Sequence, residues 1–210
     1  MKSKLLLASL LSLSAMTANA TILTFSNTNS QLPANYGDYV SEPGAFSYPE
    51  GNGYTPNVSL DFLPNSLGPY SIYSGGYASL TDALGHGNFN VSGEIVFTPN
   101  NGASVLLHGF DMATWSSGSY QTDIRIWDVN GSLANPNLFN FNQLLLPQTI
   151  YQPLGQTLQA TGALHLYINN LGSTGIDNIS FSQTPVPVPA AVWLFGSALL
   201  GFLGLTKRRS

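Results

Sequence analysis

The residues of this chain that could hold a metal ion are carboxylates. Asp111 and Asp177 are the leading candidates, and Asp123 and Asp128 could contribute to the same kind of site. Calcium takes oxygen ligands alone, so a structural calcium is the one cofactor that these residues suggest. No EF-hand spacing is present, and an acid at a strand end is commonly solvated. A purely surface role therefore stays open for each of them.

Catalytic chemistry has weaker support in the sequence than calcium binding. The histidines are far apart in the sequence, without an H-E-x-x-H motif: His86, His108 and His165. Glycoside hydrolysis requires two carboxyl groups facing a cleft, which Glu42, Glu50 and Glu94 could supply only by chance proximity. No G-x-S-x-G motif is present to activate a serine. We therefore expect a protein that is not an enzyme, with a secreted glycoside hydrolase as the least favoured alternative.

Aromatic residues are the best candidates for binding without catalysis. Sugar rings stack on exposed aromatic faces while Asn and Asp side chains bond the hydroxyl groups. Trp115, Tyr120 and Trp127 are the residues that could contact a glycan in this way. Aromatic side chains more often fill a core, so burial in the fold is the favoured alternative for these three.

Charge narrows the range of partners. Between residues 21 and 184 there are ten acidic residues and one basic residue, Arg125, which gives a net charge near −9 with histidines neutral. Such a surface repels phosphate backbones, so nucleic acid is not expected as a partner. Neutral glycans, cations and other proteins stay open. The absence of cysteine means that the fold depends on an ordinary core.

The elements that position these residues are predicted to be strands. Short runs with alternating apolar residues are separated by Gly, Pro, Asn and Ser, and no helical pattern lasts three turns. We expect strands at 21–25, 58–63, 89–97, 104–112, 122–129, 143–151, 164–168 and 176–181, with one or two more within 70–80. An all-β, antiparallel two-sheet sandwich at 21–184 follows, jelly-roll-like because the Cys and Trp spacing of an immunoglobulin domain is missing.

Both ends of the chain carry targeting patterns. Residues 1–20 have a basic start, an apolar stretch and a cleavage site at Ala18 and Ala20, which together predict a signal peptide removed by signal peptidase before Thr21. At the other end, a Pro-rich box precedes an uncharged apolar stretch at 190–205, followed by Lys207, Arg208 and Arg209. This order predicts a single C-terminal transmembrane helix with a basic cytoplasmic stop, which places the domain outside the cytoplasm.

The terminal segment 185–210 resembles a known family signal. The residues that carry the resemblance are Val186, Pro187, Val188, Pro189 and Ala190, then the apolar stretch and the Lys-Arg-Arg end. They are similar to the sorting signal of PEP-CTERM proteins of Gram-negative bacteria. The resemblance implies processing near the box by an exosortase-like membrane protease, and an association with exopolysaccharide and biofilm. The box departs from the family pattern because it has no Glu between its prolines.

A weaker, fold-level likeness concerns the body of the chain. Residues 107–111 (Leu-His-Gly-Phe-Asp) and 175–181 (Gly-Ile-Asp-Asn-Ile-Ser-Phe) look like strands of lectin-type or galactose-binding-like jelly rolls. Folds of this kind host many functions, so this likeness does not identify one.

The targeting patterns at the two ends and the resemblance of segment 185–210 together predict an exported surface or extracellular-matrix protein. It would begin as an inner-membrane-anchored precursor with a periplasmic domain. A glycan-binding, lectin-like module is the alternative.

Overall fold

A computed structural model describes residues 20–25, 32–33, 35–40, 53–64, 70–115 and 118–184. Within these ranges the chain forms strands and turns and contains no α-helix, so none of the described residues belongs to a helix that could span a membrane. The all-β prediction is confirmed for this part of the chain. The predicted signal peptide, Pro-rich box, transmembrane helix and basic tail lie outside the described residues.

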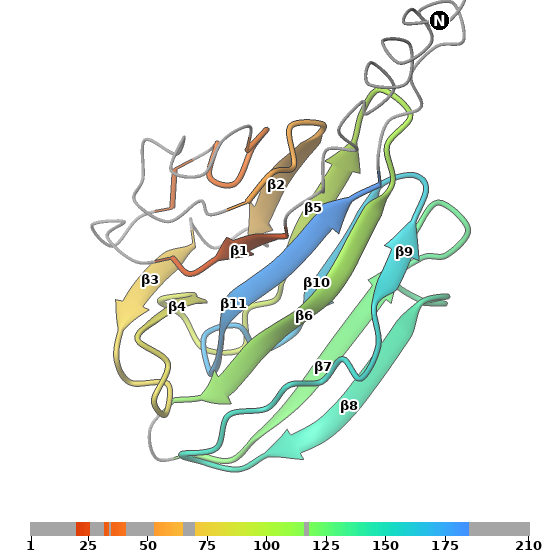
Figure 1. Cartoon of the computed structure of the whole chain (residues 1–210). Helices are drawn as coiled ribbons and strands as arrows, with labels where there is room; N and C mark the ends of the chain where they lie inside the picture. Colours follow the sequence, from red (N-terminus) through yellow and green to blue (C-terminus); the bar gives the residue numbers. More distant parts are fainter. Residues whose placement is uncertain are drawn as a thin grey trace, which may run out of the picture.

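One of the two antiparallel sheets has six strands, in the order β3-β4-β11-β6-β9, with β1 also paired to β11. Strand β11 is central to this sheet, and β6 lies beside it along most of its length (Figure 1). The strands are β1 (Thr21–Leu23), β3 (Ser71–Ser74), β4 (Asp82–Gly85), β6 (Val105–Thr114), β9 (Leu158–Ala160) and β11 (Thr174–Gln183).

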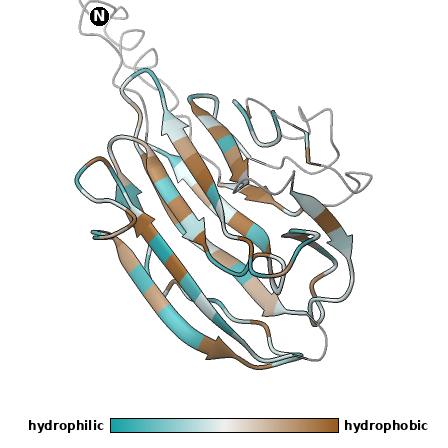
Figure 2. Cartoon of the chain, turned by 180° about the vertical axis from the view of Figure 1, so that it is seen from behind, coloured by the Kyte–Doolittle hydropathy of each residue, from teal (hydrophilic) through white to brown (hydrophobic). Residues whose placement is uncertain are grey.

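The other sheet has five strands in the order β2-β5-β10-β7-β8, so β2 and β8 form its edges. Apolar and polar residues alternate along many of the strands, as Figure 2 shows, because one face of each sheet meets the core and the other meets solvent. The strands are β2 (Val58–Pro64), β5 (Gly93–Pro99), β7 (Tyr120–Trp127), β8 (Phe139–Leu145) and β10 (Leu164–Ile168).

The winding of the chain between the sheets defines the architecture. From β4 onward the strands divide into β4-β11-β6-β9 in one sheet and β5-β10-β7-β8 in the other. Two four-stranded antiparallel sheets with these strand orders form a jelly roll. This topology agrees with the predicted jelly-roll-like sandwich. Strands β1, β2 and β3 extend this framework.

The core lies between the two sheets. Phe97 on β5 and Phe181 on β11 are both fully buried and meet edge to face, with ring centroids 5.1 Å apart. Thr122 and Thr174 join the sheets by a buried hydrogen bond of 2.8 Å between their hydroxyl groups. Each fully buried apolar side chain contributes roughly 1.5–3 kcal/mol, so a core of this kind can hold a domain without disulfides.

Several strand boundaries differ from the sequence prediction. The strand expected at 89–97 begins only at Gly93, because Asn90 has a left-handed φ of 58° that turns the chain, and Phe89 is exposed. The strand expected at 143–151 instead covers Phe139–Leu145. Gln148, with φ 57°, turns the chain after Pro147, and Tyr151 then crosses to the other sheet and bridges Met112.

Two short strands were not predicted. Strand β4 holds four residues and strand β9 only three, which is too short for an alternating pattern to stand out from the surrounding loops. Within the predicted 70–80 region the structure has one strand, β3. All of the named strands fall between Thr21 and Gln183, inside the predicted domain.

Candidate functional site

A polar hollow lies on the outer face of the six-stranded sheet. It has a volume of about 290 Å³ and is lined by residues of β6, of β11 and of the segment between β8 and β9. The lining residues are His108, Gly109, Phe110, Asp111, Gln152, Leu154, Asn178 and Ser180. The two segments singled out in the sequence, 107–111 and 175–181, therefore meet here on paired strands.

Irregular backbone gives the hollow its shape. The register between β6 and β11 shifts between Asp177 and Ser180 and again between Ser180 and Phe181. At this bulge Asn178 has a left-handed φ of 52°, a conformation that Asn adopts more readily than most residues. Across from it, a Cβ added to Gly109 would meet no atom within 4 Å. The bulge and the glycine together leave open space above the sheet.

The polar side chains of the hollow are held in place by hydrogen bonds. One carboxylate oxygen of Asp111 accepts from the Gln152 amide and the other from the Asn178 amide, both at 2.8 Å. The two ring nitrogens of His108 are hydrogen-bonded to the hydroxyl groups of Thr157, at 3.1 Å, and Ser182, at 2.8 Å. These contacts fix the side chains before any ligand arrives.

The same side chains keep unused hydrogen-bonding capacity. Each oxygen of Asp111 accepts one hydrogen bond, whereas a carboxylate oxygen can accept two. Within the described part of the chain, the hydroxyl of Ser180 and the side-chain carbonyls of Gln152 and Asn178 have no hydrogen-bond partner. The hollow therefore offers mostly acceptors, beside the apolar surface of Leu154.

The predicted calcium residues are only partly brought together. Asp111 and Asp177 are cross-strand partners on β6 and β11, and Asp177 is buried and accepts a hydrogen bond from the Asn178 amide. Asp123 and Asp128 lie on and just after β7, in the other sheet. Across the described ranges, no group of three or more His, Cys, Asp or Glu side chains could hold a metal ion. A structural calcium at Asp111 and Asp177 stays a prediction.

The three predicted glycan-contact aromatics do not line the hollow. Trp115 follows β6 and packs edge to face on Tyr77, with ring centroids 5.1 Å apart. Tyr120 is half-buried at the start of β7. Trp127 ends β7 in the five-stranded sheet, where it is only 8% exposed and stacks on His165 with centroids 5.0 Å apart. Packing thus accounts for most of the surface of Trp127.

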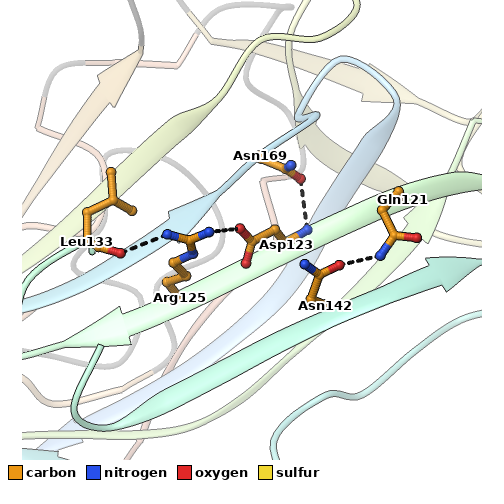
Figure 3. Close-up of polar contacts among 6 residues, drawn as sticks. All are labelled: Gln121, Asp123, Arg125, Leu133, Asn142 and Asn169. Atoms are coloured by element: carbon orange, nitrogen blue, oxygen red, sulfur yellow. Dashed lines mark hydrogen bonds and ion pairs between the residues drawn. The ribbon is translucent and has the colours of Figure 1, made fainter. Parts of the chain in front are cut away.

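The outer face of the five-stranded sheet carries a second polar group, shown in Figure 3. Arg125 donates to the Asp123 carboxylate at 2.5 Å and to the backbone carbonyl of Leu133 at 2.9 Å. The hydrogen bond to Asp123 raises the pKa of the Arg125 guanidinium above its ordinary value. Gln121 and Asn142 also bond one another. The Oδ1 atom of Asp123 and the Nε atom of Arg125 have no hydrogen-bond partner among the described residues, but both atoms are buried out of reach of a ligand. The face is therefore a poorer candidate than the hollow.

Of the three carboxylates of the hydrolase alternative, the structure describes Glu94. Glu94 is hydrogen-bonded to the Nδ1 atom of His165 at 2.5 Å, on the outer face of the five-stranded sheet. Glu42 and Glu50 lie outside the described residues. His86 is buried, and its Nδ1 atom accepts a hydrogen bond from the Asn88 amide. His108 lies on β6 and His165 on β10, so these two histidines belong to different sheets.

Gln152 and Leu154 are functional candidates that the sequence did not reveal. They belong to an irregular segment between β8 and β9, and Tyr151, the residue before Gln152, forms a backbone bridge to Met112 on β6. Backbone bonds in both directions, of 2.9 and 2.8 Å, hold that bridge. No local pattern signals such a crossing.

Comparisons with known proteins add little to this geometry. No protein-family model matches the chain, and no curated protein matches its sequence. The chain is similar to the CBM36-1 domain of a multidomain xylanase from the hindgut metagenome of Trinervitermes trinervoides, with 9% identity, a TM-score of 0.29, and coverage of 61% of this chain and 99% of that one. It is also similar to an oxalate oxidase, with 16% identity, a TM-score of 0.16, and coverage of 90% and 94%. Both TM-scores are low, so the fold assignment rests on this chain's own strand order.

Proposed function

We propose that residues 21–184 form a carbohydrate-binding domain without catalytic activity, carried by an exported protein. The observation that supports this proposal is the preorganised polar hollow on the six-stranded sheet. Binding sites for small molecules are concave and combine apolar surface with a few fixed polar groups. The hollow has this combination, and it favours the glycan-binding alternative over a matrix protein that binds nothing.

The chemistry of the hollow suits a neutral saccharide. Sugar hydroxyl groups can donate to the unused acceptor sites of Asp111, Gln152 and Asn178, and a bond to the charged Asp111 carboxylate is the strongest of these. Leu154 offers apolar surface to the C–H groups of a sugar ring. An anionic sugar would be repelled by Asp111 and by the net charge near −9 of residues 21–184.

A binding role without catalysis agrees with the side chains of the hollow. Asp111 is the one carboxylate among its described lining residues, whereas glycoside hydrolysis needs two. His108, the other titratable group there, is hydrogen-bonded through both ring nitrogens. The hollow can therefore hold a sugar, but it offers no paired acid and base.

Export is the second part of the proposal, and it rests on the ends of the sequence. Residues 1–20 would be removed by signal peptidase, and residues 185–210 would hold the precursor in the inner membrane until an exosortase-like protease processes the box from Val186 to Ala190. The mature domain would then act at the cell surface or in the extracellular matrix. Exopolysaccharide at that location would be the polymer that the hollow binds.

Two substitutions in the hollow test the binding proposal. Gly109→Leu would fill the hollow, because the new side chain enters open space and not the core. Asp111→Asn would remove the charged acceptor, which costs about 1.5–3 kcal/mol, or roughly 10- to 100-fold in affinity. Electrophoresis of the full chain in non-ionic detergent, through gels cast with xylan, β-glucan, galactomannan or alginate, measures retention.

Controls match each substitution on other parts of the surface. Gly87→Leu adds the same side chain to an exposed loop, and Asp61→Asn neutralises an exposed carboxylate on β2. We expect both controls to keep the retention of the parent chain on a neutral polymer, while both hollow variants lose it. Equal retention of all four variants, or no retention of the parent on any polymer, would count against a saccharide site in the hollow.

A further inference from the structure

The edges of the two sheets differ in how well they are protected. An unpaired edge strand presents free N–H and C=O groups to another chain, and most proteins shorten, cover or charge such edges. In the six-stranded sheet the strands paired on one side only are β3, of four residues, and β1 and β9, of three residues each. These edges are protected by their shortness.

Strand β2, at one edge of the five-stranded sheet, is covered by its own chain. The carbonyl of Val58 accepts a hydrogen bond from the Tyr39 amide at 2.8 Å, and the amide of Leu60 donates to the Asp38 carboxylate at 2.6 Å. The exposed Asp61 adds a charge in the middle of the strand. This edge is both occupied and charged.

Strand β8, at the opposite edge, has none of these protections. It is seven residues long, and its residues, Phe-Asn-Phe-Asn-Gln-Leu-Leu, include no charge and no proline. Among the described residues, its backbone hydrogen bonds go to β7 alone, and Figure 1 shows it as the outermost strand of its sheet. No Asp, Glu, Lys or Arg occurs between Asp128 and Asp177, so the uncharged stretch includes β8 together with β9 and β10.

We propose that β8 pairs with β8 of a second copy of this chain, antiparallel and about a twofold axis, so that two five-stranded sheets become one continuous sheet. The partner is a second copy because the edge is self-complementary: it places uncharged Asn and Leu side chains opposite uncharged Asn and Leu. An isologous pairing of this kind closes on itself and buries both free edges.

The side chains of β8 agree with this pairing. Asn140, Asn142 and Leu144 are exposed on the outer face, and Leu144 is 55% exposed. If the twofold axis passes through Asn142, the middle residue of the strand, each Leu144 covers Asn140 of the other copy, and the two Asn142 amides meet. The Oδ1 atom of each Asn142 already accepts from the Gln121 side chain of its own copy, but its second lone pair and the Asn142 NH2 group can still bond the other Asn142, so the contact needs no counter-ion.

The pairing is independent of saccharide binding, because the hollow lies on the other sheet. It would nevertheless alter how the protein meets a polymer. A twofold pair carries two hollows, and linked sites on one repetitive polymer raise the overall affinity without a new contact. The pairing and the binding proposal can therefore fail separately.

Cysteine cross-linking tests the pairing directly, because the chain has no cysteine of its own. The single variants are Asn140→Cys, Asn142→Cys and Leu144→Cys in the full chain, treated in membranes with a short thiol-specific cross-linker. With the axis through Asn142, Asn142→Cys cross-links to itself. Asn140→Cys and Leu144→Cys each stay monomeric alone and cross-link when the two are mixed. Directly opposite Cβ atoms in such a pair are about 4.5–5.5 Å apart.

The control is Asp61→Cys on the covered β2 edge, which should give no covalent dimer.

Other registers of the twofold pair shift the mixed cross-link. An axis through Phe141 would join positions 140 and 142, and an axis through Gln143 would join positions 142 and 144. Either result would still support a twofold β8 pair. Asn140→Lys in the Asn142→Cys background places a charge in the pair and should reduce the dimer band severalfold, whereas Asn140→Ser should not. Self-cross-linking at all three β8 positions, cross-linking of Asp61→Cys, or no dimer at any position would overturn the proposal.

Discussion

Asp128 shows how single side chains order the loops of this jelly roll. It follows β7 and is only 7% exposed, and one of its carboxylate oxygens accepts hydrogen bonds from the Asn130 amide at 2.8 Å and from the Asn137 side chain at 2.7 Å. These bonds, first that of the Asn130 backbone amide, lower the pKa of Asp128 below its ordinary value of 3.8. The ionised carboxylate therefore holds the turn between β7 and β8.

Asp128→Asn should lower the free energy of unfolding by about 1–3 kcal/mol at neutral pH, because an amide cannot accept both bonds equally well. A group whose pKa is lowered by folding stabilises the fold above its ordinary pKa and loses that effect as pH falls through the folded value. The difference between parent and variant should thus be full near neutral pH and shrink below pH 3.8. Urea unfolding at several pH values measures it, and a difference that does not change with pH would contradict the account.

At the scale of elements, close contact between loops fixes how the strands join. Gly172 lies in the turn between β10 and β11, and a Cβ on it would come within 1.9 Å of the Asn88 carbonyl oxygen. The neighbouring Leu171 amide donates to the Val91 carbonyl at 2.6 Å. The turn before β11 is therefore clamped against the loop before β5.

Gly172→Ala should destabilise the domain by about 1–3 kcal/mol, because the methyl group meets backbone that cannot move aside as a side chain would. Gly155→Ala is the matched control, since a Cβ there meets nothing within 4 Å, and its effect should stay within about 0.5 kcal/mol. Thermal unfolding of both variants gives the comparison. An equal melting temperature for the two variants would show that the contact between Gly172 and the Asn88 carbonyl leaves room for a methyl group, contrary to the structure.

The sequence predicted these elements where alternation was long enough. Val58, Leu60 and Phe62 alternate, and the strand is found there as β2. Strands β4 and β9 are too short to show a pattern, and the end of β8 depends on the left-handed turn at Gln148. The order of the strands in each sheet could not be predicted from local sequence pattern either, because it depends on contacts between residues far apart in the chain.

The candidate site was predictable only in part for the same reason. The segments 107–111 and 175–181 were singled out, and the structure pairs them. The hollow also needs Gln152 from an irregular segment and the bulge at Asn178, neither of which follows from residue spacing. Trp115, Tyr120 and Trp127 were chosen by residue type, but the structure buries Trp127 and packs Trp115 on Tyr77.

At the scale of the whole molecule, the two targeting signals proposed for the ends of the sequence make two further predictions. Protein recovered outside the cell should begin at Thr21 and end near residues 186–191, because signal peptidase and an exosortase-like protease would remove the two ends. Intact mass analysis measures both termini.

Deleting residues 190–205 should abolish membrane retention of the precursor, since this apolar stretch is the proposed anchor. An extracellular protein that keeps Ser210, or unchanged fractionation after the deletion, would contradict proteolytic sorting.

The hollow on the six-stranded sheet is proposed to bind sugar. The most direct measurement is a crystal structure of the protein with an oligosaccharide of the polymer that retains it best in the gels. We expect a sugar ring beside Leu154, with a hydroxyl group within hydrogen-bonding distance of the Asp111 carboxylate. A sugar bound instead over Arg125 and His165 on the five-stranded sheet, with the hollow empty, would contradict it.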